Sequence, residues 1–194
     1  MDNLEFLENS KLWNRPKFRM NEAKSAFFEL PDRYNMNDLF KNSSRDFKYS
    51  LKRSKKKNLT YIYTNNPDSN HLAEISIGMF KKKKIKMMEY QDFENFKLTL
   101  KNNMYYIIAY DEEQNPLAYR AVLILKNKAW DIAAATSLRG RKNFAGFGIF
   151  EELIKNLVKL SVKKFNLGSL ITENEGVNSF KLGTGAKELL YVGE

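Results

Sequence analysis

A glycine pair, Gly146 and Gly148, stands directly before the most regular apolar pattern of the chain. In that pattern Ile149, Leu153 and Leu157 recur on one face of a helix. The N-terminus of a helix presents unpaired N–H groups and the positive end of a dipole, and glycine lets the main chain approach a ligand closely. The pair therefore favours a phosphate-binding loop. A plain strand-to-helix turn, where glycine is also frequent, is the alternative.

Candidates for proton transfer lie near the C-terminus. Glu173 and Glu175 follow an expected strand that ends at Ile171, and both are candidate general bases. Tyr191, on the last expected strand, can protonate a leaving group. For the acidic residues, an ordinary solvated surface position is the alternative. Further candidate bases lie in the middle of the chain, namely Tyr110, Tyr119 and Asp131.

Rare residue types exclude several other chemistries. The sequence has no cysteine, which excludes disulfides, thiolate nucleophiles, zinc fingers and iron–sulfur clusters. Its one histidine, His71, cannot form a histidine-rich metal site, so no metal is expected. Direct acyl transfer to an amine needs no covalent nucleophile, and that reaction suits such a composition.

Length and charge set wider limits. With 194 residues we expect one domain over 1–194, made of an N-terminal strand region over 1–35 and a core over 36–194. The net charge of +10 attracts phosphate-bearing partners such as RNA, an anionic membrane surface or a nucleotide cofactor. The sequence has no run of about 18 apolar residues and no signal-like N-terminus, so we expect a cytoplasmic protein without a membrane span.

Three β-like runs lead up to the glycine pair, at residues 104–111, 116–127 and 128–137. We expect them to form an antiparallel meander. After a loop over 138–148 the sequence predicts a helix over 149–165, followed by a strand, a short polar helix and a last strand.

The earlier half of the chain alternates between strands and helices. Strands are expected over 24–30 and 59–65, and helices over 36–57, 69–80 and 91–101. The first of these helices is amphipathic and carries one of two clusters of lysine and arginine.

This order of elements resembles the central and C-terminal parts of the GNAT acyltransferases. The resemblance implies the α/β (α+β) class, with a GNAT-like mixed, mostly antiparallel central sheet flanked by helices. It also implies acyl-CoA, such as acetyl-CoA, as the donor. In that family a loop opens the long helix, and its backbone amides hold the pyrophosphate of the cofactor. The loop has the pattern Arg or Gln, two residues, Gly, one residue, Gly or Ala, and the matching stretch here holds Arg141, Asn143, Gly146, Phe147 and Gly148.

Two positions depart from that family pattern. Arg141 lies five residues before Gly146 instead of three, and Asn143 occupies the place where Arg or Gln is usual. The resemblance further implies that backbone N–H groups of a splayed strand, here residues 133–137, stabilise the oxyanion. Ala135 and Ser137 would then lie beside the donor, although small side chains also permit tight packing.

A more specific likeness is to the Fem-type peptidyltransferases, which are built on the same fold, commonly in two copies. Three blocks carry it, at residues 42–63, 105–124 and 166–194, and the chain has room for one unit. The likeness implies that Lys181, in the family's C-terminal Phe-Lys element, lies near the acyl-transfer centre. A structural lysine on a short helix is the alternative.

Three functions follow from these observations. The first is acyl transfer from acyl-CoA to an amine or hydroxyl on a small molecule, a saccharide or a protein. The second, implied by the Fem likeness, is aminoacyl transfer from charged tRNA. The third is non-enzymatic nucleic-acid binding on a GNAT-like fold. A single unit also leaves an open sheet edge, which a homodimer can cover.

Overall fold

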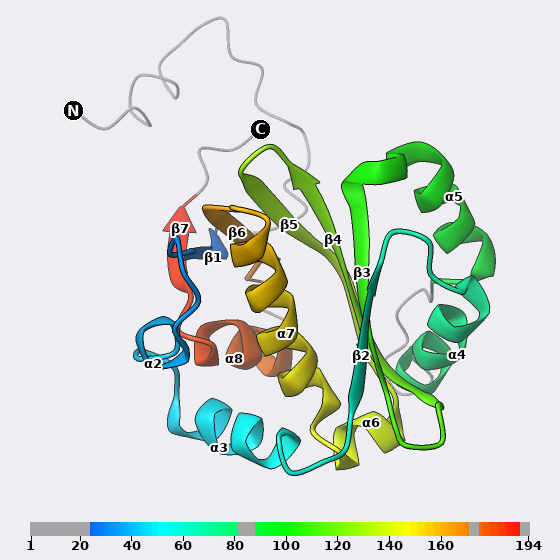
Figure 1. Cartoon of the computed structure of the whole chain (residues 1–194), viewed down its shortest axis with the longest axis horizontal. Helices are drawn as coiled ribbons and strands as arrows, with labels where there is room; N and C mark the ends of the chain where they lie inside the picture. The colour runs from blue at the N-terminus through cyan, green and yellow to red at the C-terminus, as the bar shows by residue number, and fades with distance from the viewer. Residues whose placement is uncertain (1–23, 81–87, 171–174, 191–194) are drawn as a thin grey trace, which may run out of the picture.

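The computed structural model describes residues 24–80, 88–170 and 175–190, which are built around one twisted sheet (Figure 1). Its seven strands lie in the order β2-β3-β4-β5-β6-β1-β7, and all neighbours are antiparallel except β5 and β6. The mostly antiparallel sheet expected from the sequence is confirmed. The strands are β1 (Lys24–Glu29), β2 (Thr60–Thr64), β3 (Met104–Tyr110), β4 (Pro116–Leu125), β5 (Lys128–Thr136), β6 (Lys164–Ser169) and β7 (Lys187–Leu190).

Helices cover both faces of the sheet. Side chains alternate along β3, so Ile107 and Ala109 pack into one core while Tyr106 and Ile108 pack into another. None of the described helices is long and apolar enough to cross a membrane. The first face carries α3 (Arg45–Ser54), α7 (Ala145–Lys159) and α8 (Glu175–Gly183), with α2 (Met36–Leu39) and α6 (Leu138–Lys142) nearby; the second carries α4 (Ser69–Phe80) and α5 (Tyr90–Leu100), which leads into the 3₁₀ turn η1 (Lys101–Asn103).

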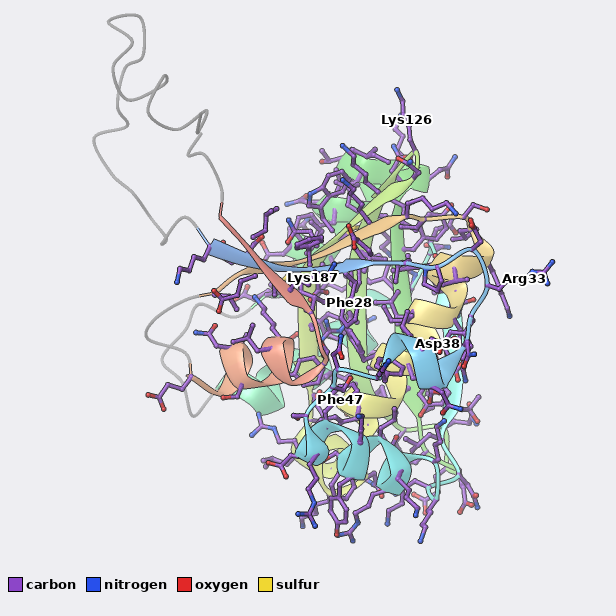
Figure 2. The ribbon with its side chains drawn as sticks, turned by 90° about the vertical axis from the view of Figure 1, so that its left-hand side faces the viewer. Phe28, Arg33, Asp38, Phe47, Lys126 and Lys187 are labelled. Carbon is purple, nitrogen blue, oxygen red and sulfur yellow. The ribbon has the colours of Figure 1, made fainter. Side chains whose placement is uncertain are left out.

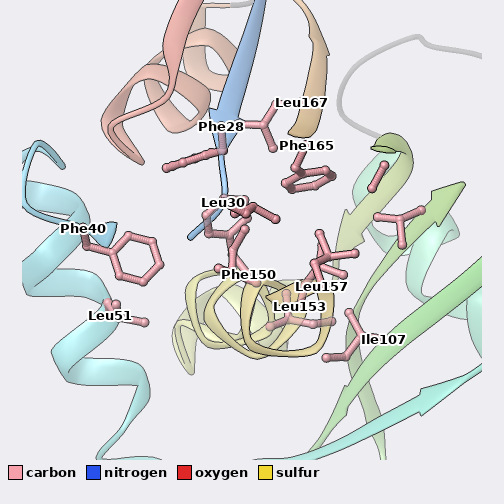
Figure 3. Packing of buried hydrophobic residues seen from close by; sticks show 14 of the residues in the cluster. Phe28, Leu30, Phe40, Leu51, Ile107, Phe150, Leu153, Leu157, Phe165 and Leu167 are labelled. Atoms are coloured by element: carbon pink, nitrogen blue, oxygen red, sulfur yellow. The ribbon is translucent and has the colours of Figure 1, made fainter. Parts of the chain in front are cut away.

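Aromatic rings fill the first core, around Phe150 of α7 (Figure 3). The Phe150 side chain is fully buried, and its ring centroid lies 6.0 Å from that of Phe28 and 5.6 Å from that of Phe180. Viewed from the β7 side in Figure 2, Phe28 and Phe47 lie inside while Arg33 and Lys126 extend outward. These rings fix α3, α7 and α8 against the same strands.

Two expectations about helices were wrong in their boundaries. The helix expected over 36–57 is interrupted after Leu39, because the Ser44 hydroxyl accepts a hydrogen bond from the Phe47 amide at 3.1 Å and starts α3 afresh. The loop expected over 138–148 contains α6, which is capped in the same way by Ser137. In both places a local side-chain bond to the backbone competes with the expected structure.

Gly148 is required by packing between α7 and its neighbours. A Cβ at this position would overlap Tyr61 Oη and Ser54 Oγ, so Gly148→Ala forces the Tyr61 and Ser54 side chains to move. We expect the free energy of unfolding to fall by about 1–3 kcal/mol, measured by urea denaturation. Gly176→Ala is the matched control, because a Cβ there meets nothing within 4 Å. Equal stability of the two variants would contradict the packing role.

Candidate functional site

The strands β5 and β6 pair only at their beginnings and then separate. Their parallel register holds Lys128 to Lys164, Ala129 to Phe165 and Trp130 to Asn166. From Asp131 onward, β5 pairs with β4 alone among the described residues. Backbone N–H and C=O groups that point away from β4 over 131–136 are therefore available to a ligand.

Two local features explain the separation. Ala133 pairs with Ala121 and Asp131 with Val122, so Ile132 is an extra residue, a β-bulge that bends β5. On the other side Gly168 adopts a φ of +80°, and its amide donates to Asn166 Oδ1 at 2.7 Å. A bulge in one strand and a left-handed glycine in the other turn the two strands apart at the same level.

A buried ion pair lies at this level, on the α7 side of the sheet. Arg120 Nη1 of β4 donates to Asp131 Oδ2 of β5 at 2.7 Å, and the two side chains are 9% and 10% exposed. The guanidinium carbon lies 5.2 Å from the ring centroids of both Phe150 and Phe180. The rings hold the arginine from α7 and α8 through cation–π contacts.

Lys181 of α8 reaches the same place. Its Nζ donates to the Ser169 carbonyl at 2.7 Å. A Cβ on Gly168 would lie 3.6 Å from Lys181 Nζ and 3.9 Å from the Asp131 carbonyl oxygen. These distances are ordinary van der Waals contacts, so Lys181 Nζ lies close to Gly168 of β6, on the side of that residue that faces Asp131 of β5.

Burial changes the acid–base behaviour of both groups. It lowers the pKa of Lys181 below its ordinary value of 10.5, with Asp131 opposing and Arg120 adding to the change. It raises the pKa of Asp131 above its ordinary value of 3.8, although Arg120 and Lys181 act in the opposite direction. Neighbouring groups whose pKa values are shifted in opposite directions are typical of catalytic centres as well as of buried ion pairs.

The start of α7 lies beside the end of β5. A Cβ on Gly146 would be 3.0 Å from Thr136 Oγ1. Phe144 precedes the helix with a φ of 56°, and among the described residues no side chain caps it and no acidic residue occupies its first turn. Arg53 lies over the Phe144 ring, with its guanidinium carbon 4.8 Å from the centroid, and Arg141 is exposed nearby on α6. These features fit the binding of an anionic ligand to the first backbone amides of α7.

Four other residues expected at a cofactor site pack in the core or make hydrogen bonds that stabilise the fold. Ala135 is buried in the core beneath α4 and α5, on the other face of β5 from Asp131. The Ser137 hydroxyl caps α6, and Asn143 Nδ2 donates to the Arg139 carbonyl at 3.1 Å. Phe147 packs against Phe47 and Phe180, with centroid distances of 5.6 and 5.5 Å.

The candidate bases are distributed over different places. Glu173 and Tyr191 lie outside the described residues, and Glu175 is exposed at the start of α8. The Tyr110 and Tyr119 side chains lie on the α4 side of the sheet, away from Lys181. Tyr110 Oη is 3.3 Å from His71 Nδ1, and Tyr119 Oη is 3.0 Å from Ser76 Oγ.

The structure adds one residue that the sequence reasoning missed, which is Arg120. A signal was present, because this arginine interrupts the apolar strand around it and a charge inside such a strand needs a partner. Its partner Asp131 stands 11 residues later, on the next strand of the meander.

Comparison with known proteins identifies similar structures rather than similar sequences. No family model and no curated protein matches the sequence. A crystal structure of FemX matches 92% of the chain with a TM-score of 0.79 at 11% identity. L-PGS from Bacillus licheniformis matches 86% with a TM-score of 0.61 at 16% identity. A GNAT-family acetyltransferase from Staphylococcus aureus Mu50 matches 66% with a TM-score of 0.52 at 16% identity.

The matched proteins differ in how much of their own length is covered. The chain spans 62% of the FemX chain, 57% of the L-PGS chain and 82% of the acetyltransferase chain. At these identities the comparisons show the fold.

Proposed function

The chain has the GNAT-like fold expected from its sequence, and its likeness to FemX covers 92% of its own length. From this premise we propose that it is an acyltransferase. Its donor would be acyl-CoA and its acceptor an amine or a hydroxyl, joined by direct transfer. One observation carries the proposal. Three features lie together where β5 separates from β6: the open edge of β5, the Lys181 ammonium group and the uncapped start of α7.

Each part has a role in such a reaction. Acyl-CoA supplies an activated acyl thioester. The amides of Ala145 and Gly146 would hold its phosphates, helped by the positive end of α7 and by Arg141. Backbone N–H groups of β5 over 131–136 and Lys181 Nζ would stabilise the negative charge that develops on the carbonyl oxygen. Small side chains at Ala133 and Ala134 leave the strand accessible.

Substitution of Gly146 tests the donor. Gly146→Glu places a carboxylate where the phosphates would lie, so we expect acetyl-CoA to bind at least about tenfold more weakly than to the wild type, measured by calorimetry. Gly146→Ala controls for the added Cβ near Thr136, and Gly176→Glu adds the same charge at an open position on α8. Equal affinity in Gly146→Glu and Gly176→Glu would contradict the assignment.

A second candidate is an acyltransferase that takes an aminoacyl group from charged tRNA. The extent of the FemX likeness supports it, because the sequence also resembles Fem-type enzymes, which use that donor. Exposed basic side chains on α3, including Lys48, Lys52 and Arg53, add to this support. Saturable tRNA binding that weakens steeply with salt, without acetyl-CoA binding, would favour this candidate.

A further inference from the structure

Asp131 carries a buried oxygen that the fold leaves unsatisfied. Oδ2 accepts from Arg120, whereas Oδ1, like Arg120 Nε, is buried without a hydrogen-bond partner among the described residues. An unpaired buried polar atom costs about 1–3 kcal/mol, and more when it is charged. The oxygen lies on the residue where β5 leaves β6, beside the place that Lys181 reaches. Such an unpaired carboxylate oxygen, next to a strand whose edge is open, is a place where a hydrogen-bond donor of a ligand can bind.

We infer that Asp131 Oδ1 accepts the proton that an attacking primary amine must lose, and that the acyl acceptor is therefore an amine. This inference rests on the proposed acyltransferase function and deepens it. The amine nitrogen forms a bond to the acyl carbon and becomes positively charged. It passes one proton to Asp131 Oδ1, the bond from the acyl carbon to the carrier sulfur breaks, and the sulfur receives that proton. Asp131 is thereby ionised again.

The surroundings of Asp131 suit this exchange. Among the described residues, the charged groups that face it are Arg120 from β4 and Lys181 from α8, while α7 contributes the Phe150 ring beneath Arg120. Arg120 holds one oxygen in place, so the other keeps a fixed position. Burial also raises the pKa of Asp131, which makes it a better proton acceptor than an exposed carboxylate.

The same surroundings favour an amine over a hydroxyl. A neutral amine attacks without prior deprotonation, and its nitrogen then becomes acidic enough for a carboxylate to accept the proton. An aliphatic hydroxyl needs a stronger base as it attacks. His71, the one histidine of the chain, contacts Tyr110 on the opposite face of the sheet.

Two amines of different basicity separate catalysis from structure. With acetyl-CoA as donor, Asp131→Asn should lower kcat/KM about 100-fold for ethanolamine. The loss should be at least about tenfold smaller for hydroxylamine, whose weakly basic nitrogen loses its proton to water more readily. A thiol-reactive chromophore follows the released CoA without background from the protein, because the chain has no cysteine. A merely structural role would lower both rates alike.

Controls keep the outcomes distinct. Asp38→Asn removes an exposed carboxylate and should leave the ratio of the two rates unchanged. Wild-type kcat/KM, calculated per concentration of unprotonated ethanolamine, should fall as the pH drops through the pKa of Asp131, which lies above 3.8. Referring the rate to the unprotonated amine removes the protonation of the amine itself, and the measurement does not depend on a variant folding. An active wild type without this acid limb, or with an unchanged ratio in Asp131→Asn, overturns the inference alone. A wild type that binds acetyl-CoA but releases no CoA with either amine overturns the inference alone. A wild type that does not bind acetyl-CoA overturns the proposed function and the inference together.

Discussion

Lys181→Met is expected to lower kcat by about 100- to 1000-fold, because it removes the side-chain donor placed between β5 and β6. Methionine retains most of the apolar stem, so the contacts of α8 with the aromatic core should persist. The measurement is acetyl-CoA turnover with ethanolamine, together with acetyl-CoA affinity, which should change little. A loss confined to kcat indicates an interaction made in the transition state.

The control for this variant is Lys187→Met. Lys187 is exposed on β7 and pairs with Glu29 at the surface, so removal of its charge should leave turnover unchanged. If Lys181→Met retained wild-type turnover, Lys181 would be a structural residue that ties α8 to the Ser169 carbonyl.

Phe150→Ala is expected to reduce the free energy of unfolding by about 3–5 kcal/mol. The ring is fully buried among Phe28, Phe47 and Phe180, and it also lies against the Arg120 guanidinium. Its removal leaves a cavity between β1, α3 and α8 and deprives a buried cation of one aromatic face. Urea denaturation followed by circular dichroism measures the effect.

Tyr49→Ala serves as the comparison, because this aromatic residue of α3 is 57% exposed and should change stability by no more than about 0.5 kcal/mol. A Phe150→Ala variant as stable as Tyr49→Ala would show that the core collapses around the missing ring. The rings around Phe150 would then not be what positions α8.

The meander was predictable because its pattern is local. The runs at residues 104–111, 116–127 and 128–137 alternate or concentrate β-forming side chains, and short turns require that neighbours pair. The later course of the chain, with its long helix, short helix and last strand, followed from periodicity and is confirmed. The boundaries expected for the long helix, 149–165, were wrong at both ends, because α7 spans Ala145–Lys159. The helix ends before Ser161, whose φ is 58°, and β6 starts at Lys164.

The parts of the site that depend on residues far apart in the sequence could be predicted less well. The ion pair between Arg120 and Asp131 requires the β4–β5 register, and the bulge at Ile132 changes that register by one residue. Gly148 matched a family pattern, yet its lack of a side chain is explained by Tyr61 and Ser54 on other elements. Lys181 was placed near the centre by resemblance, and the structure locates its Nζ between β5 and β6; its catalytic role stays a prediction.

The position of β1 in the sheet has a consequence for how the chain is made. β1 is the first of the described strands to be synthesised, but it lies between β6 and β7, and Phe28 pairs with Phe165 far along the sequence. Its two partners among the described strands, β6 and β7, are synthesised only after residue 163, whereas the β3–β4–β5 meander can pair earlier. Contacts of such large sequence separation form slowly. During translation the apolar side chains of β1 therefore stay exposed until β6 and β7 follow. A chaperone that covers this segment should raise the yield of native protein.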